Sequence, residues 1–578
     1  MAAALLVVFL AAKATALAGH HVPLSWWTPV AFVWEDAIVV LAFALVAKAV
    51  PRIAGPAYAI LAAYAAINVP VTRVVSTPLT WSMWRAARGP LADSIRLYLT
   101  PASVAMILTV CAIAAIAPRL LRGLRRTAVH GMYAALVVCA ALGPVSASRV
   151  DTVGFERNAW MALATTTLPR LSANGAAAEW AATGFDLSRH DELAGFRGAA
   201  AGRNIVFVSL ESTAAQYLGV YGADPDVMPN LSALAQSAIV FDRAYAVYPE
   251  SIKGLYSTLC SAYPALDRVA DAYADVPCRS IAAVLSAHGY RTAPFHSGRF
   301  AYLGMEAIVR HRGYDLLADA GDLGGRRESS FGVDEPSTVA HILKWIDALP
   351  RGRKFFVTYL PIAGHHPYDT PDSSSRGPFS DRDDFGRYRN AIYYGDAALG
   401  ALVDGVAARG LADRTLWIVI GDHGEAFGQH EGNFGHTFQI YDENVHVPLL
   451  VAAPGLWTRQ TRSPRVVSSI DAAPTLLDLA GIDAPHDYQG RSALDGEARL
   501  ALFFADYSHN LVGLRDGSMK FIDDLDSGRG RLFDLDRDPS EARDVSSRFP
   551  DRARWYRRNL RAWSASQRAR LDGATNGR

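Results

Sequence analysis

The sequence predicts an α/β protein with an attached membrane part, in the form of about five transmembrane helices followed by an α/β sandwich with a mainly parallel central sheet. Residues 1–150 are rich in Ala, Val, Leu and Ile and carry few charges. From residue 204 onward, short apolar runs typical of buried strands alternate with helical segments, which is the pattern of a doubly covered parallel sheet. The expected divisions are residues 1–147 for the helical bundle, 148–202 for a juxtamembrane connector, 203–545 for the α/β domain and 546–578 for an Arg-rich C-terminal helix.

Five apolar segments support the predicted bundle: residues 2–19, 30–50, 54–72, 101–118 and 128–146. Each is about as long as a helix that crosses a bilayer. The first resembles a signal peptide in length, but it lacks a basic start and further apolar segments follow, which favours a retained helix. A set of buried helices in a soluble protein is the alternative, although so many long apolar segments in succession are typical of membrane proteins.

Basic residues in the short loops predict the orientation of this bundle. Lys48 and Arg52 lie in one loop, and a cluster of four arginines lies in the loop near residues 119–126. Both loops fall on the same side, which should be cytoplasmic, although Arg73, Arg85, Arg88 and Arg96 in the opposite loop reduce the bias. We therefore expect a multi-pass protein of a bacterial-type cytoplasmic membrane, with the chain after residue 147 on the extracytoplasmic side.

Charge and cysteine content limit which partners and which cross-links are expected. The formal net charge of +1 at pH 7 provides no global field for nucleic acid, and no such partner is expected. Cys260 and Cys278 fall in the extracytoplasmic part, where they either pair or remain two buried thiols, and no CxxC motif is present. The Arg-rich segment 548–570 predicts either a solvated helix or a contact with anionic lipid headgroups.

Polar groups follow two of the predicted strands. Glu211 comes directly after the apolar run 204–210, and Asp422 and His423 follow the run 416–421. Because ligands bind outside the carboxyl ends of strands in open α/β sheets, these three side chains can meet at one edge of the sheet. Two carboxylates and a neutral imidazole are plausible ligands for a divalent metal ion.

Ser251 is the candidate nucleophile near this edge. It follows Pro249 and Glu250 and opens a predicted helix, whose first amide groups favour an anion such as phosphate. Metal binding would lower the pKa of a serine hydroxyl and hold its oxygen for attack. The alternative is that Ser251 only caps the helix.

Histidines recur where other predicted strands end. His296 stands in Phe-His-Ser-Gly, His365 in Gly-His-His-Pro, and His436 in Phe-Gly-His-Thr. Several histidines in one cleft indicate acid catalysis or phosphate binding, whereas any one alone is equally well a satisfied polar residue of the core.

The motifs between residues 203 and 545 together resemble the sulfatase and alkaline-phosphatase superfamily, and most closely its lipoteichoic acid synthase and phosphoglycerol transferase branch. That branch has five membrane helices and an extracytoplasmic catalytic domain. The segments that carry the resemblance are Ser209-Leu-Glu-Ser212, Ser251 to Pro264, Phe295-His-Ser-Gly, His311-Arg-Gly-Tyr-Asp315, Phe331-Gly-Val-Asp334, Asp422-His-Gly-Glu425, His436, His446-Val-Pro448, Leu532-Phe-Asp-Leu and Asp538-Pro-Ser-Glu541.

The resemblance implies a set of site residues. The implied metal ligands are Glu211, Ser251, Asp422 and His423, with Ser251 also the nucleophile; His296 and His365 contact the phosphoryl group or headgroup, and His436 lies near the leaving group. Sulfatases mature a Cys or Ser to formylglycine by reading a Pro or Ala two residues on and an Arg four residues on. Lys253 and Leu255 occupy those places here, so Ser251 is expected to remain serine. The synthase branch commonly has threonine at this position.

The expected activity is therefore a metal-dependent membrane phosphotransferase that moves a phosphoglycerol- or phosphoethanolamine-type headgroup from a phospholipid to a glycan or polymer through a phospho-serine intermediate. The alternative is a membrane-anchored sulfatase-like hydrolase of phosphodiesters, phosphonates or sulfate esters. A pseudo-enzyme that only binds is disfavoured because all four ligand candidates are present. One divalent ion is expected, with mixed oxygen and imidazole ligands favouring Mn²⁺ or Zn²⁺ over Mg²⁺ or Ca²⁺.

Overall fold

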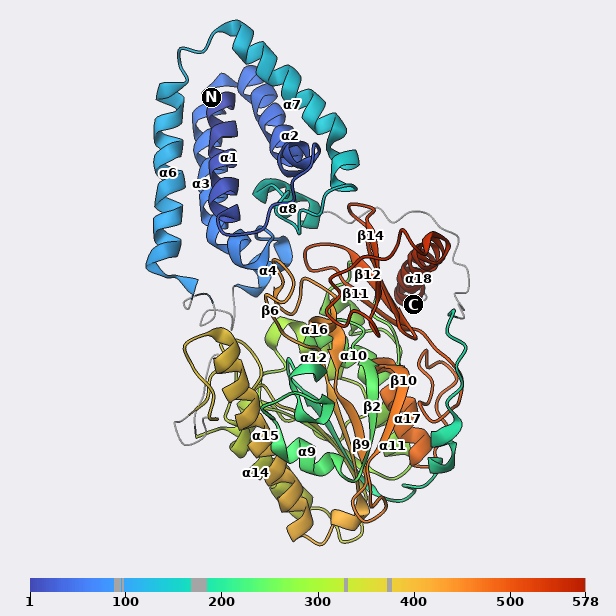
Figure 1. Ribbon diagram of the computed structural model, residues 1–578. Helices are drawn as coiled ribbons and strands as arrows, with labels where there is room; N and C mark the ends of the chain where they lie inside the picture. Colours follow the sequence, from blue (N-terminus) through green and yellow to red (C-terminus); the bar gives the residue numbers. More distant parts are fainter. Residues whose placement is uncertain (88–94, 96–97, 168–183, 327–330, 372–376, 577–578) are drawn as a thin grey trace.

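The structure is a computed structural model that describes residues 1–87, 95, 98–167, 184–326, 331–371 and 377–576. A bundle of long helices lies at one end and an α/β domain at the other (Figure 1). This arrangement confirms the predicted fold class. Arg88, Arg96 and residues 168–183 of the predicted connector lie outside the described residues.

The bundle contains five long helices. They are α1 (Ala2–Leu17), α2 (Thr28–Ala49), α3 (Ala54–Val75), α6 (Pro101–Leu120) and α7 (Arg126–Ala147). Among the described residues, four segments are long and apolar enough to cross a membrane, namely 28–49, 51–75, 101–120 and 126–147. Helix α1 has only 16 residues, and its Leu5, Val8 and Phe9 are buried against the other helices. The shorter α4 (Trp81–Ala86) and α8 (Ala159–Thr167) lie where the bundle meets the α/β domain (Figure 1).

The α/β domain is built on an eight-stranded sheet in the order β10-β2-β9-β5-β1-β4-β3, with β8 beside β2. The central strands β1, β4 and β5 are apolar and fully buried, as expected for strands covered on both faces. All neighbours pair in parallel except those that involve β8 and β9. The strands are β1 (Asn204–Leu210), β2 (Ala238–Tyr245), β3 (Arg291–His296), β4 (Phe355–Leu360), β5 (Thr415–Gly421), β8 (His446–Val447), β9 (Leu449–Ala452) and β10 (Thr461–Ser468).

Helices cover both faces of this sheet, each over its own hydrophobic core. One face carries α10 (Ser251–Cys260), α11 (Ile281–Ala287), α12 (Met305–Val309) and α17 (Ala472–Leu479). The other carries α9 (Pro229–Ala235), α13 (Ala320–Leu323), α14 (Glu335–Asp347) and α15 (Asp384–Ala408). Cys260 at the end of α10 forms a disulfide with Cys278, so the paired alternative for these thiols is the one that the structure contains.

A second, antiparallel sheet follows in the order β11-β12-β13-β14, and the C-terminal helix packs on it. Its elements are β11 (Ala501–Ala505), β12 (Leu511–Asp516), β13 (Met519–Asp524), β14 (Gly530–Asp534) and α18 (Pro550–Asn576). Tyr556, Leu560 and Trp563 of α18 are buried in the core below this sheet. Between β5 and β8 in the chain lie three short elements: β6 (Ala426–Phe427), β7 (Phe434–Gly435) and the single turn of helix α16 (Asp442–Val445).

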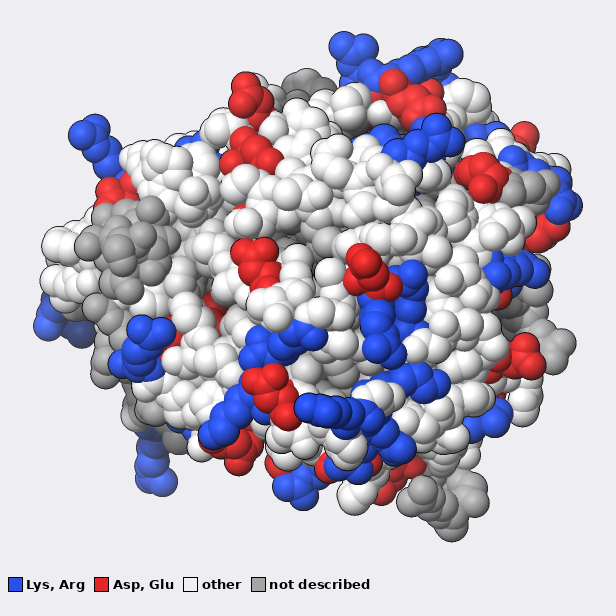
Figure 2. All heavy atoms as spheres, turned by 90° about the horizontal axis from the view of Figure 1, so that it is seen from below, with Lys and Arg blue, Asp and Glu red and all other residues white. Residues whose placement is uncertain are grey.

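The end of the molecule opposite the bundle has a mixed charge. Lys and Arg side chains lie interspersed with Asp and Glu side chains on this face (Figure 2). The mixture agrees with the net charge of +1.

Candidate active site

The predicted metal ligands meet at the carboxyl ends of two neighbouring strands. β1 and β5 pair in parallel, with Leu210 opposite Gly421. The next residue on each strand is therefore Glu211 or Asp422, and both carboxylates emerge at the same edge of the sheet. One ligand atom each of Glu211, Asp422 and His423 lies within 4.8 Å of the others. The strand-end pattern in the sequence thus locates a compact group of three potential ligands.

Ser251 lies directly against this group. It is the first residue of α10, and its hydroxyl donates a hydrogen bond to Glu211 Oε2 at 2.9 Å. The same oxygen lies 3.2 Å from His423 Nε2. The hydroxyl therefore contacts two of the three potential ligands while standing at the start of a helix.

Backbone contacts hold the imidazole and one carboxylate in place. His423 Nδ1 donates to the Gly424 carbonyl at 2.9 Å, so Nε2 is the nitrogen that faces the two carboxylates. That nitrogen is 3.5 Å from both Glu211 Oε1 and Asp422 Oδ2. Asp422 Oδ1 accepts the amide hydrogens of Ser212 at 3.0 Å and of His423 at 2.7 Å, so only Oδ2 is left for a ligand.

The electrostatics of the group match a bound dication. Burial and the adjacent Glu211 carboxylate raise the pKa of Asp422 to about 8. Burial alone would lower the pKa of His423, but the two carboxylates raise it to about 10. At pH 7 these shifts leave Asp422 protonated and His423 as an imidazolium beside the ionised Glu211, and a divalent cation among these oxygen and nitrogen atoms would replace both protons without changing the net charge of the group. The donor set therefore fits a metal ion.

His436 extends the group by one further imidazole. Its ring centroid is 4.2 Å from that of His423, and its Nδ1 is 2.7 Å from Glu425 Oε2. The hydroxyl of Tyr368 donates to the other oxygen of Glu425 at 2.6 Å. Burial alone would raise the pKa of Glu425, but His436 and Tyr368 hold it below its ordinary value. Glu425, which belongs to the Asp-His-Gly-Glu motif, thus orients His436 as an anionic partner, a role that the sequence analysis did not assign.

His296 and His365 lie at the ends of the next two strands. His296 closes β3 and donates from Nδ1 to the Leu360 carbonyl at 3.0 Å. His365 follows β4, has Nδ1 2.6 Å from the His366 carbonyl oxygen, and lies with its ring centroid 6.1 Å from that of His436. Burial lowers the pKa of both, so both are neutral imidazoles at pH 7. The structure therefore brings all seven predicted site residues to one edge of one sheet.

The start of α10 differs from the expectation in one respect. The helix start predicts amide groups that face a bound anion, whereas the Glu250 carboxylate accepts the amide hydrogen of Lys253 at 3.3 Å. Lys253 itself is buried, and its Nζ lies 2.8 Å and 2.9 Å from the two oxygens of Asp506. Lys253, which occupies one of the positions of the formylglycine signature, is thus held by Asp506, about 250 residues away in the sequence. No local sequence pattern indicates this contact.

Two family models match the part of the chain that contains this site. Residues 203–482 match the sulfatase family model. Residues 428–551 match the family of the C-terminal region of N-sulphoglucosamine sulphohydrolase. The two matches together span both sheets and include every predicted site residue.

Individual relatives include a lipoteichoic acid synthase-like protein and an arylsulfatase. The chain is 26% identical over 317 residues to the lipoteichoic acid synthase-like protein YvgJ of Bacillus subtilis, covering 52% of this chain and 51% of that protein. It is 28% identical over 242 residues to arylsulfatase K of Mus musculus, covering 37% and 43%. The chain thus spans about half the length of the curated relatives it matches.

Solved structures show the same fold. The lipoteichoic acid synthase LtaP from Listeria monocytogenes superposes with a TM-score of 0.54 at 18% identity, covering 67% of this chain and 97% of that one. A protein in the alkaline phosphatase superfamily from Vibrio parahaemolyticus gives a TM-score of 0.52 at 23% identity, covering 66% and 90%. These likenesses establish the fold and leave the substrate to be argued from the site.

Proposed function

Because residues 203–482 belong to the sulfatase family, we propose that this chain is a metal-dependent membrane phosphotransferase that uses Ser251 as its nucleophile. It transfers a phosphoglycerol- or phosphoethanolamine-type headgroup from a phospholipid to a hydroxyl of a glycan or polymer. The observation that carries the proposal is the position of the Ser251 hydroxyl, 2.9 Å from Glu211 and 3.2 Å from His423 within a group of ligands suited to a dication.

Four residues of this group are the proposed metal ligands: Glu211, Asp422, His423 and the Ser251 oxygen. A divalent cation held there supplies Lewis acidity that lowers the pKa of the serine hydroxyl and neutralises charge on a phosphoryl oxygen. The mixed oxygen and imidazole donors favour Mn²⁺ or Zn²⁺, with Mg²⁺ and Ca²⁺ as the alternatives.

The proposed reaction proceeds in two displacements at phosphorus. Ser251 releases its hydroxyl proton to solvent and its Oγ attacks the phosphorus of the lipid headgroup; the bond from phosphorus to the diacylglycerol oxygen breaks, and His436 gives that oxygen a proton. An acceptor hydroxyl then attacks the phospho-serine and its proton passes to His436, while the bond to Ser251 Oγ breaks and this oxygen regains a proton from solvent. His296 and His365, both neutral, donate or accept hydrogen bonds to the transferred group from the ends of β3 and β4.

The membrane part fits a lipid donor. In the part of the chain that the structure describes, four helices are long and apolar enough to span a bilayer. The α/β domain lies at the end of the bundle where α4 and α8 are found (Figure 1). We place residues 1–147 in the cytoplasmic membrane as a multi-pass bundle, residues 148–202 as the connector, and residues 203–545 with the helix 546–578 on the extracytoplasmic side. A donor within the bilayer is then close to the site, and the acceptor arrives from outside.

The proposal is tested by mass spectrometry of the full-length protein in phosphatidylglycerol vesicles with Mn²⁺, with Ser251→Ala as the comparison. We expect a phosphoglycerol adduct on Ser251 in the wild type and neither adduct nor diacylglycerol release in the variant. Phosphatidylethanolamine vesicles tell the two headgroups apart. Full diacylglycerol release by Ser251→Ala with retained metal would overturn the mechanism.

Hydrolysis is the second candidate, favoured by the matches to arylsulfatase K and to the sulphohydrolase C-terminal family. The same nucleophile and ligands serve a reaction with water as acceptor. Product analysis with and without added glycan acceptors separates the two. A free glycerol phosphate product whose yield is unchanged by acceptor would establish the hydrolase.

A further inference from the structure

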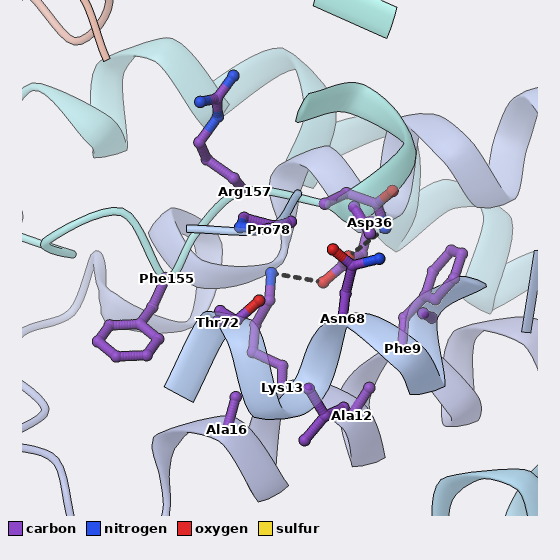
Figure 3. Close-up of a pocket in the computed structure, with 14 residues that line it drawn as sticks. Phe9, Ala12, Lys13, Ala16, Asp36, Asn68, Thr72, Pro78, Phe155 and Arg157 are labelled. Carbon is purple, nitrogen blue, oxygen red and sulfur yellow. Dashed lines mark hydrogen bonds and ion pairs between the residues drawn. The ribbon is translucent and has the colours of Figure 1, made fainter. Parts of the chain in front are cut away.

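A buried ion pair lies within the helical bundle, toward its predicted extracytoplasmic side. Lys13 of α1 and Asp36 of α2 approach to 2.7 Å between Nζ and Oδ2, and their side chains are only 10% and 2% exposed. Figure 3 shows both side chains directed toward each other. Both line a small cavity of about 40 Å³. Charged groups within membrane helices are costly unless they are paired, and they commonly mark a functional element.

This ion pair holds the first residues of the connector. Asn158 Nδ2 donates to Asp36 Oδ1 at 2.7 Å, and the Asn158 amide donates to Glu35 Oε2 at 2.6 Å. Lys13 Nζ also donates to the Glu156 carbonyl at 3.0 Å. The acidic and basic groups of α1 and α2 thus bind residues 156–158 directly, at the point where the chain leaves the bundle.

The next contact passes from the connector to the catalytic domain. Arg157 Nη1 donates to the carbonyl and hydroxyl oxygens of Ser508 at 2.8 Å and 2.9 Å, and all three groups are buried. The hydroxyl of Thr77, just beyond α3, lies 2.6 Å from the hydroxyl of Ser508. Thr80 Oγ1 donates to the Tyr507 carbonyl at 3.2 Å. The bundle and connector therefore hold the loop between β11 and β12 from two directions.

That loop borders the nucleophile helix. Asp506, two residues before Ser508, is the partner of Lys253 on α10 and accepts a 2.7 Å hydrogen bond from the Tyr248 hydroxyl. Lys253 lies two residues after Ser251. The domain is thus attached to the bundle beside the catalytic serine, and the attachment determines where the active site lies relative to the membrane surface.

We propose that the Lys13–Asp36 pair, together with Asn158 and Arg157, is a docking clamp that positions the active site over its membrane-bound donor. Lys13 and Asp36 are positioning residues, because neither contacts the predicted metal ligands. The clamp sets access to a lipid headgroup but leaves the internal geometry of the site to β1, β5 and α10. This inference rests on the proposed function, since only a donor held in the bilayer requires a fixed domain position.

The test compares two substrates on the full-length protein in phosphatidylglycerol vesicles with Mn²⁺. One is the lipid donor, followed by diacylglycerol release, and the other is the water-soluble diester bis(4-nitrophenyl) phosphate. Lys13→Met leaves Asp36 buried without its cation, so we expect lipid turnover to fall about tenfold or more. Turnover of the soluble diester should stay within about twofold of the wild type, since the metal-ligand group is intact.

Two further variants distinguish a loss of docking from a folding defect. Lys13→Met with Asp36→Leu removes both charges of the pair together, and it should show the same selective loss. Lys48→Met is the matched control, because Lys48 is an exposed lysine at the far end of α2, and we expect no loss with either substrate.

A disulfide tether tests docking without any lipid reaction. The Thr77 and Ser508 oxygens lie 2.6 Å apart, so Thr77→Cys with Ser508→Cys should form a cross-link on oxidation. We expect slower cross-linking in the Lys13→Met/Asp36→Leu background, and restored lipid turnover once the cross-link has formed. Unchanged cross-linking, failed rescue by a complete cross-link, or an equal loss with both substrates would overturn the clamp. If the wild type cleaves only the soluble diester, the proposed lipid donor is wrong. The cross-linking rate then still tests the docking clamp.

Discussion

The contact between Glu425 and His436 gives a sharp test of the proposed proton donor. Glu425→Gln keeps the shape and one acceptor for the 2.7 Å contact with His436 but removes the negative charge. A hydrogen bond to a charged group contributes about 1.5–3 kcal/mol and a neutral one about 0.5–1.5 kcal/mol, so the loss is about 1–2 kcal/mol. If this stabilisation acts on the imidazolium form of His436, the rate of diacylglycerol release falls about five- to thirty-fold. The assay is single-turnover formation of the Ser251 adduct with saturating lipid and Mn²⁺.

Tyr368→Phe is the matched control for this substitution. Tyr368 donates to the other oxygen of Glu425 at 2.6 Å, so its removal costs one hydrogen bond and keeps the charge beside His436. We expect the rate of adduct formation to fall by less than about threefold, since the lost hydrogen bond is made to Glu425 and not to His436. Two results would refute the reasoning: a Glu425→Gln rate within about twofold of the wild type, or a loss that disappears at higher Mn²⁺ concentration. The second result would assign Glu425 to metal binding.

Three further predictions concern stability and the metal. Replacing Cys260 by Ser opens its disulfide with Cys278, which closes a loop with a sequence separation of 18, and should lower the free energy of unfolding by about 3 kcal/mol in denaturant titrations of oxidised protein; equal stability would contradict this. Lys520→Met leaves two buried carboxylates without their cation, Glu541 at 2.9 Å and Asp442 at 2.7 Å, and should cost about 3–5 kcal/mol. Burial raises the pKa of Glu541 to about 7, so its share of the cost is largest above pH 7, where Glu541 is ionised, and shrinks as the pH falls and this carboxyl gains a proton, while the share of Asp442 remains; a cost that grows on acidification would contradict this. Removal of the cation with EDTA should abolish turnover. The affinity for re-added Mn²⁺, measured by calorimetry, should fall as the pH drops below about 10 and more steeply below about 8, because the proton of His423, with a pKa of about 10, and that of Asp422, with a pKa of about 8, must both leave. A pH-independent affinity would exclude both as ligands.

The candidate metal site is the part of the molecule that could be predicted most directly from the sequence. Glu211, Asp422 and His423 each follow an uninterrupted apolar run, and such runs predict buried parallel strands whose carboxyl ends share an edge. The structure pairs those two strands as neighbours, and the three side chains converge. The helical bundle could be predicted equally directly, because long apolar segments predict membrane helices from composition alone.

Partners distant in the sequence could not be predicted in this way. The sequence shows that Lys253 departs from the formylglycine signature, but not that Asp506 holds it from a loop of the second sheet. It shows a Glu near the outer end of an apolar segment, but not that the neighbouring Asp36 pairs with Lys13 of another helix.

The sequence by itself determined the classes of segment and the residues that stand at their ends, because periodicity and apolar length report on local burial. Only the tertiary structure decided the antiparallel direction of β9, the packing of Trp563 beneath the second sheet, and the hydrogen bonds that join the connector to the catalytic domain. The physical reason is that an isolated charge or aromatic ring in the sequence is compatible with solvent, with lipid or with a partner. Its environment follows only when segments hundreds of residues apart pack against one another and exclude water from the contact.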